Sequence, residues 1–195
     1  MPGTLDDWRA RIAEQRRLLR EEALSLPVGP PPPWTHECYI HAGGVIAAGW
    51  SAAEHVLLVS ADGYSITHPD TGERLERNRD AQVGYAGLSR SGLTFTVPTT
   101  GEEIPIFGVF GGAGIYGTED HWRLEIIAPD WPDEMVLLYD PSAAEPGAGR
   151  FGLFYGAHRL ALPALGGELR GRGFAPSGLR FMVVASDGAL VYSPL

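Results

Sequence analysis

The sequence lacks several features that commonly reveal where a protein works. Its 195 residues include one cysteine, Cys38, so no disulfide can form within the chain and nothing indicates an oxidising compartment. No run approaches the roughly 18 apolar residues of a membrane-spanning helix, and the first residues contain no apolar centre of the kind found in signal peptides. We therefore expect a cytoplasmic protein that does not associate with membranes.

Motifs of familiar chemistry are also missing. The chain has no Gly-x-Ser-x-Gly nucleophile elbow, no P-loop and no Cys-x-x-Cys pair. The glycines of Gly112–Gly117, with Asp140 downstream, are spaced as in a dinucleotide-binding fingerprint, which requires a helix directly after the glycines. Residues 118–127 instead alternate with the period of a strand. We therefore expect a glycine-rich connection between strands, and no cofactor.

Two histidines invite comparison with the zinc-protease motif. His36 and His41 are five residues apart, whereas that motif places its histidines four apart on one face of a helix. Here they lie on a predicted strand, where they point to different sides. We expect no metal site.

Glycine and proline, by contrast, are abundant. The 26 Gly and 16 Pro lie mostly between short apolar runs, a pattern typical of turn-rich β folds, and the length suits one domain with an appendage. We expect a mainly β fold of antiparallel sheets, either compact and propeller-like or a sandwich. The predicted strands are 42–51, 56–60, 64–67, 93–97, 104–110, 122–127, 135–139, 151–155, 180–185 and 190–192.

The N-terminal segment predicts one amphipathic helix over residues 5–25. Thr4 is a suitable N-cap with acids in the following turn, and apolar residues recur at helical spacing. This stripe packs on the domain or, alternatively, binds a partner; it comprises Leu5, Trp8, Ile12, Leu19, Ala23 and Leu26. The proline-rich residues 27–33 then predict an extended connector. The expected division is therefore 1–33, helix and connector, and 34–195, a single β-rich domain.

An internal sequence repeat has one copy near each end of this β-rich region. Residues 58–69 align without a gap on residues 183–194, and both copies contain an Asp-Gly pair between apolar runs. Upstream, Gly49-Trp50-Ser51 matches Gly173-Phe174-Ala175, with one extra residue in the later copy. Asp-Gly between such runs predicts a hairpin, so each copy predicts a strand, a loop and a hairpin.

These units resemble single blades of the WD-repeat family. The resemblance implies propeller-like hairpins but departs from the family pattern, because His68-Pro69 and Ser193-Pro194 replace the Trp-Asp pair and residues 80–165 hold no further copy. The wider pattern from Gly43 onward resembles uncharacterised bacterial proteins, which implies no catalytic residue. The first copy matches at His41, Val45, Trp50-Ser51, Ala61-Asp62-Gly63 and Asp70-Thr71-Gly72, and the second at Phe174–Gly178 and Ser186-Asp187-Gly188.

The net charge of −9 is concentrated in one segment. Residues 102–145 carry ten acids against Arg123 alone, and the acids alternate with aromatic residues, as in protein interfaces. A solvated face that keeps the protein soluble is the alternative explanation. Such acidity attracts a basic protein and repels nucleic acid. The predicted binding residues are Glu119, Asp120, Trp122, Trp131, Asp133 and Glu134.

Two hypotheses about function follow. The favoured one is a non-enzymatic protein-binding module, such as a bacterial immunity or inhibitor protein whose acidic face caps a basic toxin. A bacterial source is indicated because all 15 basic residues are arginine and Ala, Gly and Pro are frequent, as in GC-rich genomes. The alternative is an enzyme of unrecognised type, for example a hydrolase, that uses acids or His121 in the loops of residues 111–134. The sequence does not indicate an oligomeric state.

Overall fold

The computed structural model describes residues 4–112, 114–143 and 154–194. The chain divides into two compact units, each built from two segments. We call residues 1–30 and 122–161 the helix unit, and residues 31–121 and 162–195 the double-sheet unit. Residues 122–161 group with the N-terminal helix. Among the described helices, none has the length and apolar character needed to cross a bilayer.

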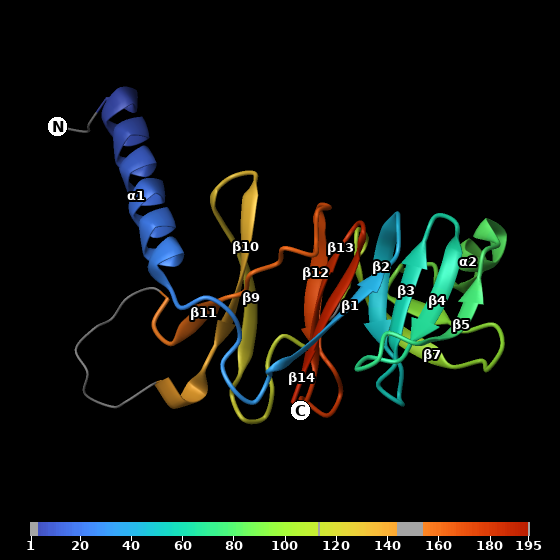
Figure 1. Ribbon diagram of the computed structural model, residues 1–195. Helices are drawn as coiled ribbons and strands as arrows, with labels where there is room; N and C mark the ends of the chain where they lie inside the picture. The colour runs from blue at the N-terminus through green and yellow to red at the C-terminus, as the bar shows by residue number, and fades with distance from the viewer. Residues whose placement is uncertain (1–3, 113, 144–153, 195) are drawn as a thin grey trace. The chain divides into compact units, whose positions relative to one another are not determined.

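The helix unit contains one long helix and a small antiparallel sheet (Figure 1). The helix is capped as predicted, since the Thr4 hydroxyl accepts the Asp7 N–H and the Asp7 carboxylate accepts the Thr4 N–H. The unit comprises α1 (Leu5–Ser25), the sheet β11 (Ala157–Arg159), β10 (Asp133–Tyr139) and β9 (Arg123–Asp130) in that order, and the 3-10 helix η1 (Pro141–Ala143).

Only the C-terminal part of α1 packs on this sheet. Ala23 is fully buried in a cluster with Leu137, Tyr139 and Phe154, and Leu19 packs against it. The residues nearer the N-terminus of the helix remain exposed, including two at the start of the predicted stripe, Leu5 and Trp8. The predicted apolar stripe is therefore covered mainly in the last turns of α1, and Ile12 of the same stripe is half-buried.

The double-sheet unit consists of two antiparallel sheets and a short helix (Figure 1). The first sheet has the order β5 (Arg74–Asn78), β4 (Gly63–Thr67), β3 (Val56–Ser60), β2 (Val45–Trp50), β7 (Glu103–Gly108) and β6 (Thr94–Thr96), with β8 (Gly111–Gly112) paired to β7. The second has the order β1 (His36–His41), β14 (Gly188–Ser193), β13 (Phe181–Ala185) and β12 (Leu169–Phe174). The helix is α2 (Ala81–Gly87), capped by the Asp80 side chain.

The mainly β, antiparallel character and the N-terminal helix are confirmed. No closed barrel or propeller is present among the described residues. Helix α2 was not predicted, because seven residues that include two glycines carry little helical signal. The strand predicted at residues 151–155 lies partly outside the described residues, and the prediction is wrong for Phe154 and Tyr155, which form a turn before β11.

The sequence repeat forms the same arrangement of strands twice. The hairpins β3–β4 and β13–β14 close on equivalent pairs, Ser60 with Gly63 and Ala185 with Gly188. Both copies also shift register at the same position, after Val45 in β2 and after Leu169 in β12. The edge position that β5 fills in the first sheet belongs in the second to β1, which comes from the other end of the chain.

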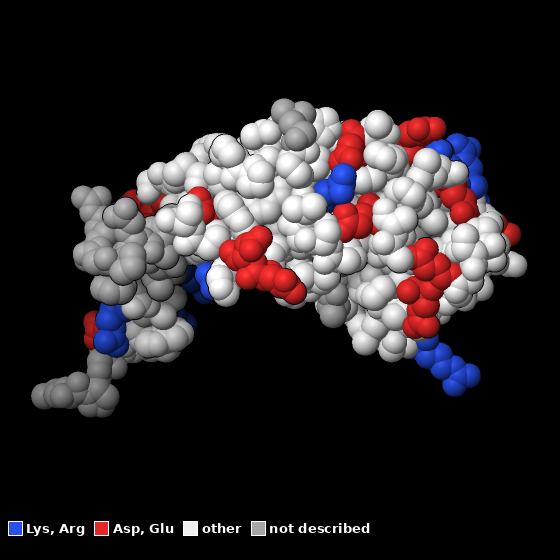
Figure 2. Space-filling model, turned by 90° about the horizontal axis from the view of Figure 1, so that it is seen from below, with Lys and Arg blue, Asp and Glu red and all other residues white. Residues whose placement is uncertain are grey.

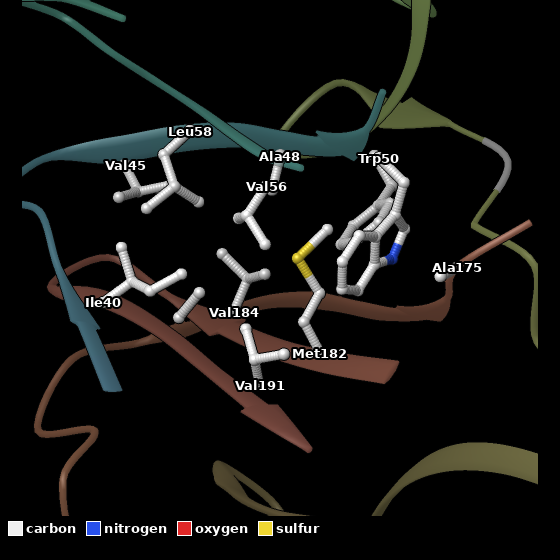
Figure 3. Packing of buried hydrophobic residues seen from close by; sticks show 12 residues of the cluster. Ile40, Val45, Ala48, Trp50, Val56, Leu58, Ala175, Met182, Val184 and Val191 are labelled. Carbon is white, nitrogen blue, oxygen red and sulfur yellow. The ribbon is translucent and has the colours of Figure 1, made fainter. Parts of the chain in front are cut away.

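An apolar layer, the inter-sheet core, fills the space between the two sheets (Figure 3). From the first copy it includes Val56 and Leu58, and from the second it includes Met182 and Val184. In the repeat alignment, Met182 and Val184 correspond to Leu57 and Val59, which lie on the opposite face of β3. The two copies therefore stack front to back, with the same orientation, and not as mirror-related faces.

An arginine at the edge of this layer links loops from both sheets. Arg180, just before β13, donates to both carboxylate oxygens of Asp70 at 3.1 and 2.9 Å and to Glu54 at 3.0 Å. Hydrogen bonds from Arg180 lower the pKa of Asp70, while burial opposes this. Burial raises the pKa of Glu54, but hydrogen bonds from Ser177 and Arg180 outweigh it and hold that pKa below its ordinary value. Because two guanidinium nitrogens of Arg180 bind both carboxylate oxygens of Asp70, this bidentate ion pair is a strong one.

We predict that Gly63→Ala lowers the free energy of unfolding by about 1 to 3 kcal/mol. Gly63 has φ +125°, which a residue with a side chain rarely adopts, and a Cβ there would overlap the Asn78 carbonyl oxygen. Urea denaturation measures the change. Gly43→Ala is the matched control, since a Cβ at Gly43 meets nothing within 4 Å; equal losses in both variants would contradict the explanation.

We predict that Arg180→Gln lowers the free energy of unfolding by about 1 to 3 kcal/mol at about pH 7. Because folding depresses the two carboxylate pKa values, the stabilisation is complete above the ordinary values of 3.8 for Asp70 and 4.5 for Glu54. It is lost as pH falls through the lower folded-state values.

The difference in the free energy of unfolding between wild type and Arg180→Gln should therefore become smaller below about pH 4. Denaturation in urea at several pH values tests this, with the exposed Arg90→Gln as control. A difference that stays constant down to the lowest pH would show that the carboxylates are not the partners that matter.

Candidate functional site

Three of the six predicted binding residues lie at the tip of one hairpin. Strands β9 and β10 pair from Arg123 with Tyr139 to Asp130 with Asp133, and Trp131 and Pro132 form the turn between them. The register shifts between the pair of Asp130 with Asp133 and the next, Met135 with Ile127, so two residues of β9 lie opposite Glu134 and the bulge is in β9. We call Trp131, Asp133 and Glu134 the hairpin tip.

The side chains of the hairpin tip face solvent. Trp131 is 75% exposed, more than any other large apolar residue among those described, and Asp133 and Glu134 are also exposed. Within the described chain, no hydrogen bond or ion pair engages either carboxylate. An uncovered indole beside two free acids is the composition of an interface centre and its rim.

The remaining predicted residues lie elsewhere. Glu119 and Asp120 are exposed in a turn of the double-sheet unit, which closes by a hydrogen bond of 3.0 Å from the His121 N–H to the Thr118 carbonyl. Trp122 belongs to the helix unit, is half-buried and interacts with other residues. The acids of residues 102–145 are thus divided between the two units, and Glu145 lies outside the described residues. On the face shown in Figure 2, Asp and Glu form several separate groups.

The enzyme hypothesis placed catalysis in the loops that contain His121. This residue is exposed, with φ 68°, and its side chain forms no hydrogen bond with another described residue. A nucleophile activated by a general base, the commonest hydrolytic arrangement, needs the two side chains within hydrogen-bond reach of each other. The turn of Thr118–His121 provides no such pair, so its geometry gives no support to a catalytic role.

The histidines at the two ends of β1 interact with separate partners. His36 Nε2 lies 2.9 Å from the Asp70 carbonyl, and His41 Nδ1 lies 3.3 Å from the Tyr39 hydroxyl. Among the described residues, no three His, Cys, Asp or Glu side chains are grouped so as to hold a metal ion.

A basic pocket of about 360 Å³ in the double-sheet unit was not predicted from the sequence. Arg74, Arg77 and Arg79 line it together with His41 and Asn78. One signal was available, since three of the four arginines in residues 34–101 fall within the six residues of Arg74–Arg79. It was obscured because the acids of this region outnumber its arginines, so its summed charge is negative.

Comparison with known proteins adds no relative. No protein family, no curated protein and no solved structure matches this chain. The resemblance to WD-repeat blades therefore stays a prediction, carried by the residues of the repeat. The functional proposals below depend on the geometry and charge of the chain's own residues.

We predict that Trp131→Ala changes the free energy of unfolding by less than about 0.5 kcal/mol, because the indole touches little of the protein. Trp50→Ala is the comparison: Trp50 is 7% exposed, and its indole N–H donates to the Gly173 carbonyl at 3.2 Å. Its loss should cost about 3 to 5 kcal/mol. A large loss in Trp131→Ala would show that the tip serves stability and not binding.

Proposed function

We propose that this chain is a non-enzymatic binding protein whose hairpin tip contacts a partner with a basic surface. The observation that carries the proposal is the 75% exposure of Trp131 beside two unpaired acids. A folded protein gains nothing by leaving an indole in water, whereas a partner pocket that covers it contributes on the order of 2 to 4 kcal/mol. The tip is therefore explained by association with another protein.

Charge supports a basic partner. The 24 acids exceed the 15 arginines, and the residues with which Trp131 shares its turn are acidic. A negative surface speeds encounter with a basic protein and slows encounter with nucleic acid, whose phosphates it repels. Nucleic acid is therefore excluded from the proposal as the ligand of the hairpin tip.

The most specific form of the proposal is a cytoplasmic bacterial immunity or inhibitor protein that caps a basic toxin. Such a protein needs a stable scaffold and an exposed, charged recognition surface, and it needs no catalytic group. The hairpin tip and the acidic composition meet these requirements. We expect the partner to have a basic surface with a pocket for an indole.

We also propose that the two repeated sheets are blades of the propeller kind. Three features support this: the shared hairpin register, the front-to-back stacking, and the completion of the second sheet by β1 from the far end of the chain. Successive blades of a propeller are related in this way. In this view the repeat is a scaffold, and recognition is assigned to residues outside it.

Affinity capture with the full chain, followed by titration of the captured partner, tests the binding proposal. We expect Trp131→Ala to weaken binding about tenfold or more, because the central aromatic anchor is lost. The double variant Asp133→Asn/Glu134→Gln should slow association and flatten its salt dependence.

Trp8→Ala is the matched control, since Trp8 is a second exposed tryptophan of the helix unit, 54% exposed. Glu119→Gln/Asp120→Asn tests whether acids of the double-sheet unit also take part. Binding that is indifferent to salt, or a partner retained equally well by Trp131→Ala, would refute the proposal.

A further inference from the structure

The basic pocket opens where the inter-sheet core ends. Leu58 belongs to that core and also lines the pocket, and beyond it the lining becomes polar. The walls are the edge strand β5, the turn between β3 and β4, and the turn that follows His41 at the end of β1. All of these elements belong to the double-sheet unit, so the pocket is a feature of one compact body.

A bulge in β5 directs two arginines into the pocket. Arg77 pairs with Ser65 and Glu76 with Ile66, but the next pair is Arg74 with Thr67, so Leu75 is an extra residue. In a regular strand Arg74 would share a face with Glu76. The extra residue returns Arg74 to the face of Arg77, and both line the pocket. Glu76 lies on the other face, where it accepts hydrogen bonds from Tyr64 and Thr99.

The arginines of the pocket have no carboxylate partner in the described part of the chain. Elsewhere Arg17, Arg123 and Arg180 each form an ion pair. Arg74 has only a long hydrogen bond of 3.4 Å to the His41 carbonyl. Partial desolvation and the charges of Arg79 and Arg74 lower the pKa of Arg77, so the three guanidinium groups repel one another. An anion among them would relieve this repulsion.

We propose that this pocket binds a small phosphorylated ligand, with its phosphate held by Arg74, Arg77 and Arg79. Guanidinium groups match the geometry of phosphate oxygens with paired donors, and several of them suit a doubly charged anion better than a single carboxylate. The volume of about 360 Å³ fits a small metabolite. This site is independent of the hairpin tip, which lies in the helix unit.

Further groups define the non-phosphate part of the ligand. Asp62 lines the same pocket and bears an acceptor, which repels phosphate but suits a hydroxyl group. Asn78 also lines the pocket, and its side-chain oxygen accepts the Asp80 N–H at 2.8 Å. A phosphate ester that carries hydroxyls, such as a sugar phosphate, meets the requirements of both the arginines and Asp62.

The turn at Gly43 and Gly44 leaves room for such a ligand. A Cβ on either residue would meet nothing within 4 Å, and Gly44 has φ +69°. Within the described chain, no hydrogen bond uses the N–H of either glycine. Both glycines line the pocket, and their N–H groups are further donors that an anion there could use.

A small ligand is favoured over a polymer. The chain carries a net charge of −9, and Asp62 lies in the pocket itself, so a long polyanion would meet repulsion on leaving the three arginines. The volume of about 360 Å³ likewise suits a single small molecule, which the exposed side chains of the three arginines can reach from solvent.

Isothermal titration of the full chain in phosphate-free buffer tests the proposal. The probes are ribose 5-phosphate, inorganic phosphate, and ribose as the uncharged arm. We expect ribose 5-phosphate to bind more tightly than inorganic phosphate, and ribose not to bind. Arg77→Gln/Arg79→Gln should weaken ribose 5-phosphate about tenfold or more, because charge-assisted hydrogen bonds are lost.

Two further variants make the outcome specific. Asp62→Asn should weaken ribose 5-phosphate and leave inorganic phosphate unchanged or tighter. Arg90→Gln removes an exposed arginine of the same unit outside the pocket, and should change neither.

Several results would overturn the assignment. The first is that neither phosphate probe binds at millimolar concentration. The second is that ribose binds as tightly as ribose 5-phosphate, and the third is that Arg90→Gln loses as much affinity as Arg77→Gln/Arg79→Gln. Tighter binding of a 5′-phosphorylated RNA oligonucleotide than of ribose 5-phosphate would make the ligand a polymer. Trp131→Ala should bind ribose 5-phosphate normally, which separates this site from the proposed partner surface.

Discussion

The front-to-back contact between the two repeated sheets is the constraint on which the double-sheet unit depends. A sheet of a few strands is marginal alone and must bury at least one apolar face. Here the layer that includes Leu58, Met182 and Val184 provides that burial for both copies at once. Because the copies keep the same orientation, the outer face of the first sheet needs a different cover, which α2 and β6 supply around Phe95.

The basic pocket is a consequence of where this layer stops. Toward the β5 edge the apolar residues give way to Ser65 and Arg77, so the space between the sheets opens to water. The double-sheet unit thus contains a polar recess, while the hairpin tip lies in the other unit. The chain thus offers two chemically opposite surfaces, one cationic and concave and one acidic and aromatic.

Local signals predicted local structure well. The Thr4 N-cap marked the start of α1, and the two Asp-Gly pairs marked two hairpins that the structure contains. The pocket was beyond prediction because it depends on the bulge at Leu75 and on the long-range pairing of β1 with β14. The acids of residues 102–145 lie in one segment of the sequence. The boundary between the two units nevertheless divides them, and no local pattern marks that boundary.

The pairing of β1 with β14 has a consequence for how the protein folds. His36 is opposite Ser193, so β1 cannot pair with β14 until Gly188–Ser193 has been synthesised. Contacts between such distant residues pay a large loop-closure entropy and slow folding. Until then β1 presents an unpaired edge on the growing chain, open to the wrong neighbours. Its flanking Pro-rich segment and the carboxylate of Glu37 are suited to limit such misassociation.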